Sequence, residues 1–267
     1  MKVGFIGAGN MASAMICGIL NSKLLSPSNI IASAKTDKTL DNIKEKYKIN
    51  TTKDSISLVK ECNIVVIAVK PNVYEEVLKQ IKDYIDNEKI IVTIAAGISM
   101  KSVEDIIGND KKIIRTMPNT PALVNCGMTS LSPNKNLDKN DIEAVKTIFD
   151  SFGKSEIVEE SLIDVVIGAS GSSPAYAFMF IEAMADCAVS YGMKREMAYE
   201  FCAQAVMGAA KMLLETKKHP GELKDMVCSP GGTTIEAVKT LENEGMRSAV
   251  IKGMASCIEK SIKMDNK

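Results

Sequence analysis

Short apolar runs rich in β-branched residues alternate with amphipathic segments along the first half of the chain. The runs that predict strands are residues 3–9, 29–34, 63–69, 89–96 and 112–117. They are continuously apolar, as parallel strands covered on both faces tend to be. Amphipathic stretches such as residues 10–22 and 72–85 separate them, and residues 138–158 predict one more helix and strand. This order predicts an α/β domain with a doubly wound sheet over residues 1–160.

The second half follows a helical pattern from about Ser161 onward. Helices are predicted over residues 161–169, 173–192 and 195–216 and again after Thr234. The second of these is apolar nearly all round, and such a helix has to be buried on every side. We therefore predict an all-helical domain over residues 161–267 that dimerises through the helices from Ser173 to Thr216. The alternative is a central helix in a self-contained bundle.

Composition excludes several classes of protein. The chain has 33 basic and 33 acidic residues, a balance that favours neither nucleic acid nor an anionic membrane as a partner. The N-terminus lacks the pattern of a signal peptide, and the longest apolar stretch, residues 175–189, carries two carboxylates and is expected to be too short to span a bilayer. The seven cysteines form no CxxC pair, so we expect small buried side chains in a cytoplasmic protein.

A glycine-rich turn follows the first predicted strand and opens a helix. It reads Gly7-Ala8-Gly9-Asn10-Met11-Ala12, directly after Ile6. The first glycine allows a tight turn, the second lets the backbone approach a pyrophosphate, and Ala12 fills the third small position. We predict a Rossmann-type dinucleotide site formed by Ile6, Gly7, Gly9, Asn10 and Met11. A glycine turn without a nucleotide is the alternative.

The end of the second predicted strand bears on the choice of cofactor. Sites that prefer NAD usually place an Asp or Glu there to bind the ribose 2′-hydroxyl. This strand instead ends in Ser33, Ala34 and Lys35. A hydroxyl and a cation suit a 2′-phosphate, so NADPH is favoured and NADH remains an option. A solvated surface lysine is the alternative reading of Lys35, and Asp37 is expected to cap the next helix.

Two further loops follow predicted strands, at the edge of the sheet where this architecture binds ligands. One loop contains Ala68, Val69, Lys70 and Pro71, and the other contains Ala95, Ala96 and Gly97. Their small side chains leave room for a flat nicotinamide ring, so both loops are predicted to contact the cofactor.

The chain shows no obvious set of catalytic side chains. Its one histidine, His219, stands beside lysines and before a proline, and is expected to be a surface residue at a helix end. No HExxH or other metal-spaced cluster exists in the sequence, so no metal site is predicted. The chemistry is therefore expected to belong to the cofactor, with the protein supplying position and electrostatics.

One loop in the helical half needs a separate explanation. Residues 228–238 read CSPGGTTIEAV, with Pro230, Gly231, Gly232, Thr233 and Thr234 in succession. A simple turn between helices needs one Gly or one Pro. A turn that uses a threonine as helix cap leaves the double glycine unexplained.

The sequence resembles the pyrroline-5-carboxylate reductase family. The blocks FIGAGNM, AVKP, AAGIS, RTMPNTPALV, SGSSPAYAF and SPGGTTIEAV are similar to those of the family, in the same order from end to end. The resemblance implies NAD(P)H-dependent reduction of 1-pyrroline-5-carboxylate to L-proline, the last step of proline biosynthesis. A reductase of another cyclic imino acid and a non-catalytic dinucleotide-binding protein are the alternatives. The family block usually reads SGSGPAY, and here Ser173 replaces its second glycine.

The resemblance also implies roles for individual residues. It places substrate at the Pro-Gly-Gly-Thr-Thr loop, with Ser229, Gly231, Gly232, Thr233 and Thr234 as substrate-binding residues. Amides at a glycine-rich helix start make a nest for a carboxylate. The expected donors are those of Gly232, Thr233 and Thr234, and the Thr234 hydroxyl is expected to reach the ring nitrogen as the catalytic group. Ser55 matches the position at which several relatives carry an asparagine near the adenosine phosphate.

Overall fold

The computed structural model describes residues 1–265, which form two compact units. One unit comprises Met1–Ser172 together with the chain from Cys257 on, and the other comprises Ser173–Ser256. The strands all lie in the first unit. The division at residues 160 and 161 was predicted from where the strand pattern stops, whereas the contacts of residues 160–172 keep them with the sheet.

The first unit is built on an eight-stranded sheet with the order β3-β2-β1-β4-β5-β6-β7-β8. All neighbouring strands are parallel except β6 and β7. The strands are β1 Val3–Ile6, β2 Ile30–Ser33, β3 Asn50–Thr52, β4 Ile64–Ile67, β5 Ile90–Thr93, β6 Lys112–Met117, β7 Gly127–Pro133 and β8 Gly153–Ile157. The order reverses at β1 and β4, so the predicted doubly wound, Rossmann-type sheet is confirmed.

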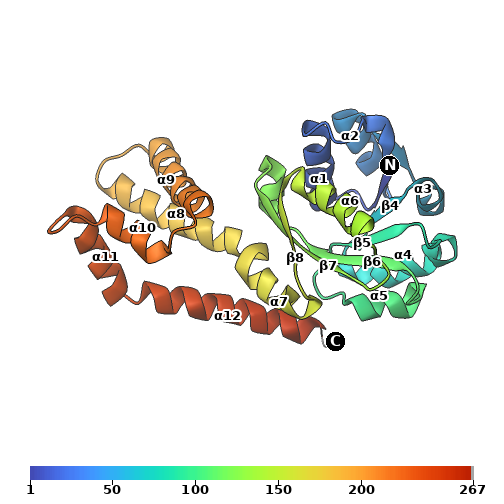
Figure 1. Cartoon of the computed structure of the whole chain (residues 1–267). Helices are drawn as coiled ribbons and strands as arrows, with labels where there is room; N and C mark the ends of the chain where they lie inside the picture. Colours follow the sequence, from blue (N-terminus) through green and yellow to red (C-terminus); the bar gives the residue numbers. More distant parts are fainter. Residues whose placement is uncertain (266–267) are drawn as a thin grey trace. The chain divides into compact units, whose positions relative to one another are not determined.

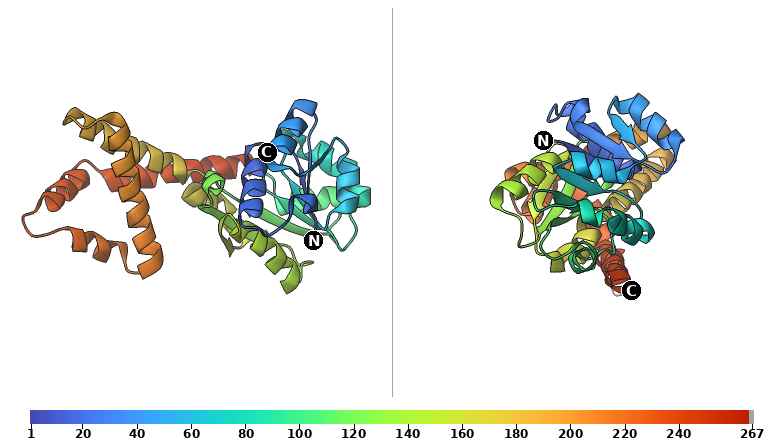
Figure 2. Two further views of the ribbon diagram at one scale, coloured as in Figure 1. Left: turned by 90° about the horizontal axis from the view of Figure 1, so that it is seen from above. Right: turned by 90° about the vertical axis from the view of Figure 1, so that its right-hand side faces the viewer.

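Helices cover both faces of this sheet (Figures 1 and 2). They are α1 Asn10–Asn21, α2 Asp37–Tyr47, α3 Ser55–Glu61, α4 Tyr74–Ile81, α5 Met100–Ile107, α6 Lys139–Asp150 and α7 Ile163–Val166, with a π-helix at Ile167–Gly171. Short 3-10 helices lie at Pro27–Asn29, Pro71–Val73, Lys82–Tyr84, Thr120–Val124 and Glu160–Leu162. Successive strand residues face opposite sides of the sheet. Val65 lies in the hydrophobic core formed with α3, α4 and α5, and Val66 lies in the core formed with α1, α2 and α6.

Two strands were missed because their sequences lack an apolar run. The edge strand β3 has the sequence NTT and is half exposed. Strand β7 reads GMTSLSP, yet Thr129, Ser130 and Ser132 are buried in it. Strand β7 lies between β6, to which it is antiparallel, and β8, to which it is parallel. Its hydroxyl groups therefore conceal a buried strand from a hydrophobicity pattern.

The start of α2 corrects a smaller prediction. Thr36, not Asp37, is its N-cap, and the Thr36 hydroxyl accepts the backbone N–H of Thr39 at 3.4 Å. Asp37 is the first residue of the helix and pairs with Lys53 at 2.7 Å. An acidic residue in the first turn still stabilises the helix through its dipole.

The second unit is all helical, as predicted. It contains α8 Ser173–Ser190, α9 Arg195–Thr216, α10 Pro220–Val227, α11 Thr233–Asn243 and the first part of α12 Met246–Asp265. Helices α8 and α9 pack against each other (Figure 2). The last turns of α12 belong to the first unit, where the Cys257 thiol lies 3.2 Å from the Ser172 hydroxyl and Ser261 donates to Asp164. Ser173, which replaces the family glycine, begins α8.

The helices of the second unit bury little of their apolar surface within one chain. Ala185 is the one buried residue that the structure shows in α8, and Ala198 is the one in α9. Phe178, Met179 and Phe201 are each more than 60% exposed, at 66%, 68% and 63%. Exposed apolar surface of this extent is typical of an interface. A self-contained bundle, the alternative considered above, would have covered these side chains.

One helical run is long and apolar enough to cross a membrane when judged by length and composition alone. It covers Glu160–Ser190, 31 residues that contain an 18-residue window with a mean hydropathy of 1.2. The expectation concerned residues 175–189 alone, and the helical run that contains them is longer because it begins at Glu160. Interface and core helices of soluble proteins have the same length and composition, so the finding carries little weight for a membrane location.

Candidate active site

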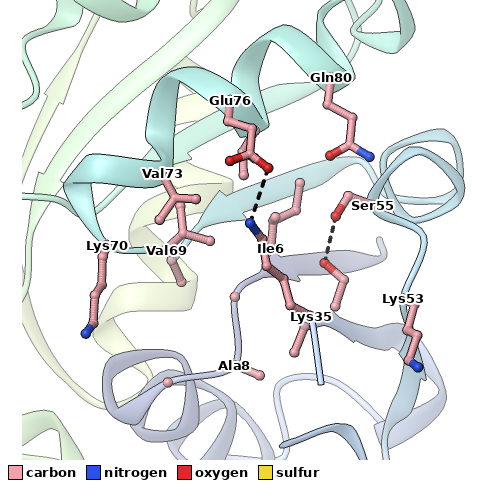
Figure 3. Close-up of a pocket in the computed structure, with 16 residues that line it drawn as sticks. Ile6, Ala8, Lys35, Lys53, Ser55, Val69, Lys70, Val73, Glu76 and Gln80 are labelled. Carbon is pink, nitrogen blue, oxygen red and sulfur yellow. Dashed lines mark hydrogen bonds and ion pairs between the residues drawn. The ribbon is translucent and has the colours of Figure 1, made fainter. Parts of the chain in front are cut away.

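A pocket of about 470 Å³ opens at the carboxyl ends of β1, β2 and β4 (Figure 3). This is the edge at which doubly wound sheets bind nucleotides. Nine of the predicted cofactor residues line it: Ile6, Gly7, Gly9, Ser33, Lys35, Ser55, Ala68, Val69 and Lys70. Segments far apart in sequence are thus brought to one cavity, and its size suits part of a dinucleotide.

The geometry of the glycine turn fits a pyrophosphate. Gly7 has φ +100°, and a Cβ there would lie 2.5 Å from the carbonyl oxygen of Ala68, so only glycine is accommodated. A Cβ at Gly9 would meet nothing within 4 Å among the described residues, which leaves the backbone open to a ligand. Gly9 is also the N-cap of α1, and no side chain of the described chain caps that helix. Its first amides are therefore available to an anion.

The far end of the pocket carries hydroxyl groups and charges. The hydroxyls of Ser33 and Ser55 lie 3.1 Å apart, which joins the end of β2 to the start of α3. Lys35 Nζ lies 3.2 Å from a carboxylate oxygen of Glu76, on α4. Figure 3 shows both contacts across the cavity. Lys35 lines the pocket, although its side chain is 74% exposed.

Six of the predicted cofactor residues are not among those that line this pocket. They are Asn10, Met11, Pro71, Ala95, Ala96 and Gly97. Sequence reasoning in turn missed Ala8, Ala34, Lys53, Val73, Glu76, Val77 and Gln80, which do line it. The last four lie on α4 or just before it, where Val73, Val77 and Gln80 follow helical spacing. That periodicity was visible, but nothing in the sequence showed that this face of α4 closes the pocket.

Tyr74 holds the two loops predicted to contact the nicotinamide. Its hydroxyl donates to the carbonyl of Ile67 at 2.5 Å and accepts the backbone N–H of Ile94 at 3.2 Å. These two residues directly precede the loops that begin at Ala68 and Ala95. Burial raises the pKa of the Tyr74 hydroxyl well above its ordinary value, so the group remains protonated and keeps its donor role. The ends of β4 and β5 are therefore fixed relative to each other.

The second of these loops is also held from its other side. Gly97 has φ +75°, a conformation that favours glycine. Three residues later, the backbone N–H of Met100 donates to Glu160 at 2.6 Å, and Arg115 binds the same carboxylate oxygen at 2.8 Å. Arg115 is 2% exposed, so this ion pair is well shielded at one end. It fixes the start of α5 behind the loop.

The Pro-Gly-Gly-Thr-Thr loop lies in the helical unit, between α10 and α11. Gly231 has φ +68°, which an L-residue adopts only with strain. Gly232 has an ordinary φ of −82°, but a Cβ there would lie 2.4 Å from Ser229 Oγ and 3.2 Å from its carbonyl oxygen. The two glycines are thus needed for different reasons, the first for backbone angles and the second for space.

The loop presents the start of α11 without a side-chain cap. Gly232 is the N-cap, and no side chain among residues 1–265 accepts from the first turn. The amide of Gly232 itself donates to Ser229 at 3.0 Å, which corrects the expectation that it binds a ligand. The amides of Thr233, Thr234 and Ile235 remain at the open end of the helix. Sequence reasoning did not include the Ile235 amide among the expected donors. The first residue of α11 decides which amides have no partner within the helix, and the sequence did not fix that residue.

Other candidate groups have structural roles. His219 is the N-cap of α10, where its Nδ1 accepts the backbone N–H of Gly221 at 3.1 Å. It therefore lies at the start of a helix, whereas the sequence predicted a position at the end of one. All seven cysteines are free, but only Cys62 is buried, so the expectation of burial is wrong for the exposed Cys126 and Cys187. Burial raises the pKa of the Cys62 thiol to about 11. Within the described residues, no group of three metal-ligating side chains exists.

Comparisons with known proteins agree with both parts of this picture. A family model described as pyrroline-5-carboxylate reductase dimerisation matches residues 160–264, and one described as NADP oxidoreductase, coenzyme F420-dependent, matches residues 2–97. The chain is 49% identical to pyrroline-5-carboxylate reductase of Escherichia coli K12, over 98% of each chain. The chain belongs to the pyrroline-5-carboxylate reductase family. A second relative, the Methanosarcina acetivorans enzyme, is 42% identical over the whole chain and 98% of its own length.

Solved structures of this family share the fold of the whole chain. A pyrroline-5-carboxylate reductase from Coxiella burnetii superposes with a TM-score of 0.93 at 33% identity, covering 98% of each chain. The Plasmodium falciparum pyrroline carboxylate reductase, solved with NADP bound, gives a TM-score of 0.88 at 32% identity, covering 99% of this chain and 98% of that one. The α/β unit followed by a helical dimerisation domain is therefore the family's architecture.

Proposed function

We propose that this protein reduces 1-pyrroline-5-carboxylate to L-proline with NADPH, the last step of proline biosynthesis, in the cytoplasm. Family membership supports the reaction. The observation that carries the proposal is the open start of α11, where Gly231 and Gly232 leave uncapped amides in the loop that matches the family's substrate block. Such a nest suits the carboxylate of a small imino acid.

The α/β unit is proposed to bind the cofactor. When bound, NADPH supplies the hydride that reduces the C=N bond. The amides at the start of α1 are proposed to hold the pyrophosphate. Ser33, Lys35 and Ser55 line the same pocket and are proposed to face the adenosine end of the cofactor. The Tyr74 hydroxyl fixes the spacing of the loops beside the nicotinamide. Asn10, Met11, Pro71, Ala95, Ala96 and Gly97 remain proposed contacts beyond the pocket itself.

The helical unit is proposed to bind and orient the substrate. The amides of Thr233, Thr234 and Ile235 bind the carboxylate, and Ser229, Gly231 and Gly232 shape the loop around it. The Thr234 hydroxyl is proposed to contact the ring nitrogen and to hold its proton in place as hydride arrives. Reduction of a protonated imine needs no general base.

The test is to follow NADPH oxidation with 1-pyrroline-5-carboxylate and to identify proline as the product. The six-membered homologue of the substrate and NADH serve as comparisons. Faster turnover of the six-membered ring would favour a reductase of another imino acid. NADPH binding without turnover of either imine would favour the non-catalytic alternative.

Thr234→Ala is expected to lower turnover or substrate affinity and to leave NADPH binding intact. A neutral hydrogen bond contributes about 0.5–1.5 kcal/mol, so the loss should be roughly three- to tenfold if the hydroxyl only holds the ground state. A loss of about a hundredfold would mean that it acts in the transition state. Thr240→Ala is the matched control, because that hydroxyl donates to Glu236 within the same helix. Equal kinetics for the two variants would remove Thr234 from the mechanism.

We also propose that the protein is a homodimer, or a larger assembly built from dimers, formed through the helices from Ser173 to Thr216. The exposed apolar side chains of α8 and α9 and the match to a dimerisation family support this. Burial in a dimer also accounts for the apolar run Glu160–Ser190 without a membrane. Sedimentation combined with activity measurements on dilution should show that activity is lost as the dimer dissociates. An active monomer would contradict the proposal.

A further inference from the structure

The pocket contains a carboxylate beside the end of β2, although that strand end itself carries no Asp or Glu. Strand β2 ends without Asp or Glu, the feature that favours NADPH. Glu76 nevertheless lines the same pocket from α4, and its carboxylate lies 3.2 Å from Lys35 Nζ. The two side chains meet across the cavity (Figure 3). The negative charge that β2 lacks is thus supplied by Glu76 from helix α4.

The Glu76 carboxylate lies where the two cofactors differ, so it affects the binding of each one differently. Residues at the end of the second strand face the 2′ position of the adenosine ribose. A 2′-phosphate carries close to two negative charges and would have to displace Glu76 from Lys35 or bind beside it. A 2′-hydroxyl instead donates a hydrogen bond that a carboxylate accepts well.

The neighbouring charges do not cancel this effect. Lys53, another cation that lines the pocket, pairs with Asp37 at 2.7 Å rather than with Glu76. Gln80 lies one turn beyond Glu76 and carries no charge. Both members of the Lys35–Glu76 pair are well exposed, at 74% and 68% of their side chains. Such a pair is weak, so a cofactor can exchange with it.

We infer that Glu76 is a specificity-determining residue that lowers the preference for NADPH over NADH. It competes with the 2′-phosphate for Lys35 and accepts the 2′-hydroxyl of NADH. This rests on the proposed function, since it assumes that the pocket binds the cofactor of an NAD(P)H-dependent reductase.

The test compares Glu76→Gln with Glu75→Gln. Glu75 is the preceding residue of α4, does not line the pocket, and pairs with Lys79 at 2.6 Å, so it provides the same loss of charge outside the site. Binding of NADP⁺ and NAD⁺ is measured by calorimetry for each protein, and kcat/KM for NADPH and NADH is measured with 1-pyrroline-5-carboxylate. For Glu76→Gln, the ratio of NADP⁺ to NAD⁺ affinity should rise by about three- to tenfold at low ionic strength, because exposed charges interact modestly.

The control and the salt dependence separate the outcomes. Glu75→Gln should leave the ratio unchanged, and the gain of Glu76→Gln should shrink at high salt. An unchanged ratio in Glu76→Gln, or an equal rise in both variants, would overturn the inference. Because cofactor binding is measured without substrate, wild-type protein that discriminates between cofactors but does not turn over the imine would contradict only the proposed reaction.

Discussion

Replacing Gly232 by valine is expected to lower kcat/KM for 1-pyrroline-5-carboxylate by about a hundredfold or more. Hydrogen bonds to a charged group contribute about 1.5–3 kcal/mol each, and losing two of them corresponds to this factor. The backbone angles of Gly232 are open to any residue, so strain is not the cause. The added Cβ would instead meet Ser229 Oγ at 2.4 Å, which forces Ser229 aside and sets a branched side chain beside the amides of α11.

The matching variants test this explanation. Gly232→Ala should lose less, because its one methyl group meets the free end of the Ser229 side chain. Affinity for NADPH should stay unchanged in both variants, since the glycine turn and its pocket belong to the other unit. Wild-type kinetics in Gly232→Val would show that the loop is only a turn and that the proposed substrate site is wrong.

Gly231 illustrates how far the sequence could predict this loop. The double glycine indicated a special function, and the resemblance to a family placed substrate there. The sequence could not show that Gly231 alone has a positive φ, nor that the amide of Gly232 closes the turn on Ser229. Both depend on where α11 begins. One shift of that boundary changes which amides remain for a ligand.

The fold was predictable where one physical pattern dominated. Strands β1, β2, β4, β5 and β6 are buried on both faces, so their continuous apolar runs identified them. Strand β7 was hidden because Thr129, Ser130 and Ser132 occupy most of its buried positions, and polar residues give no apolar run. The Ser132 hydroxyl donates to the carbonyl of Val158 at 2.8 Å, which offsets the cost of its burial. In the helical unit the apolar periodicity gave the helices, and the excess of apolar surface indicated a partner.

The cofactor site was predictable only along the strands. Motif spacing predicted that Gly7, Gly9 and the end of β2 contact the cofactor, because they lie at or just after strand ends, and all of them line the pocket. Glu76 escaped notice because it approaches from a helix 41 residues beyond Lys35, and no local pattern links the two. The charge at a site depends on every element that meets there, so the residues at one strand end do not predict it.

Lys35→Asp is expected to raise the Michaelis constant for NADPH by about ten- to a hundredfold and to change that for NADH much less. A charge-assisted contact with the 2′-phosphate contributes about 1.5–3 kcal/mol, and the substitution also sets a second carboxylate beside Glu76. NADH has no phosphate at this position, so only its ribose hydroxyl meets the new side chain. Steady-state kinetics with both cofactors measure the two effects in one preparation.

Lys38→Asp is the matched control for charge. Lys38 is exposed in the first turn of α2 and does not line the pocket, so its replacement changes the net charge equally without touching the site. It should leave both Michaelis constants unchanged, because an exposed charge outside the pocket is screened by salt. Equal effects of Lys35→Asp on the two cofactors would show that Lys35 is a solvated surface lysine. A selective loss for NADPH, absent in Lys38→Asp, would assign the cation at the end of β2 to the 2′-phosphate.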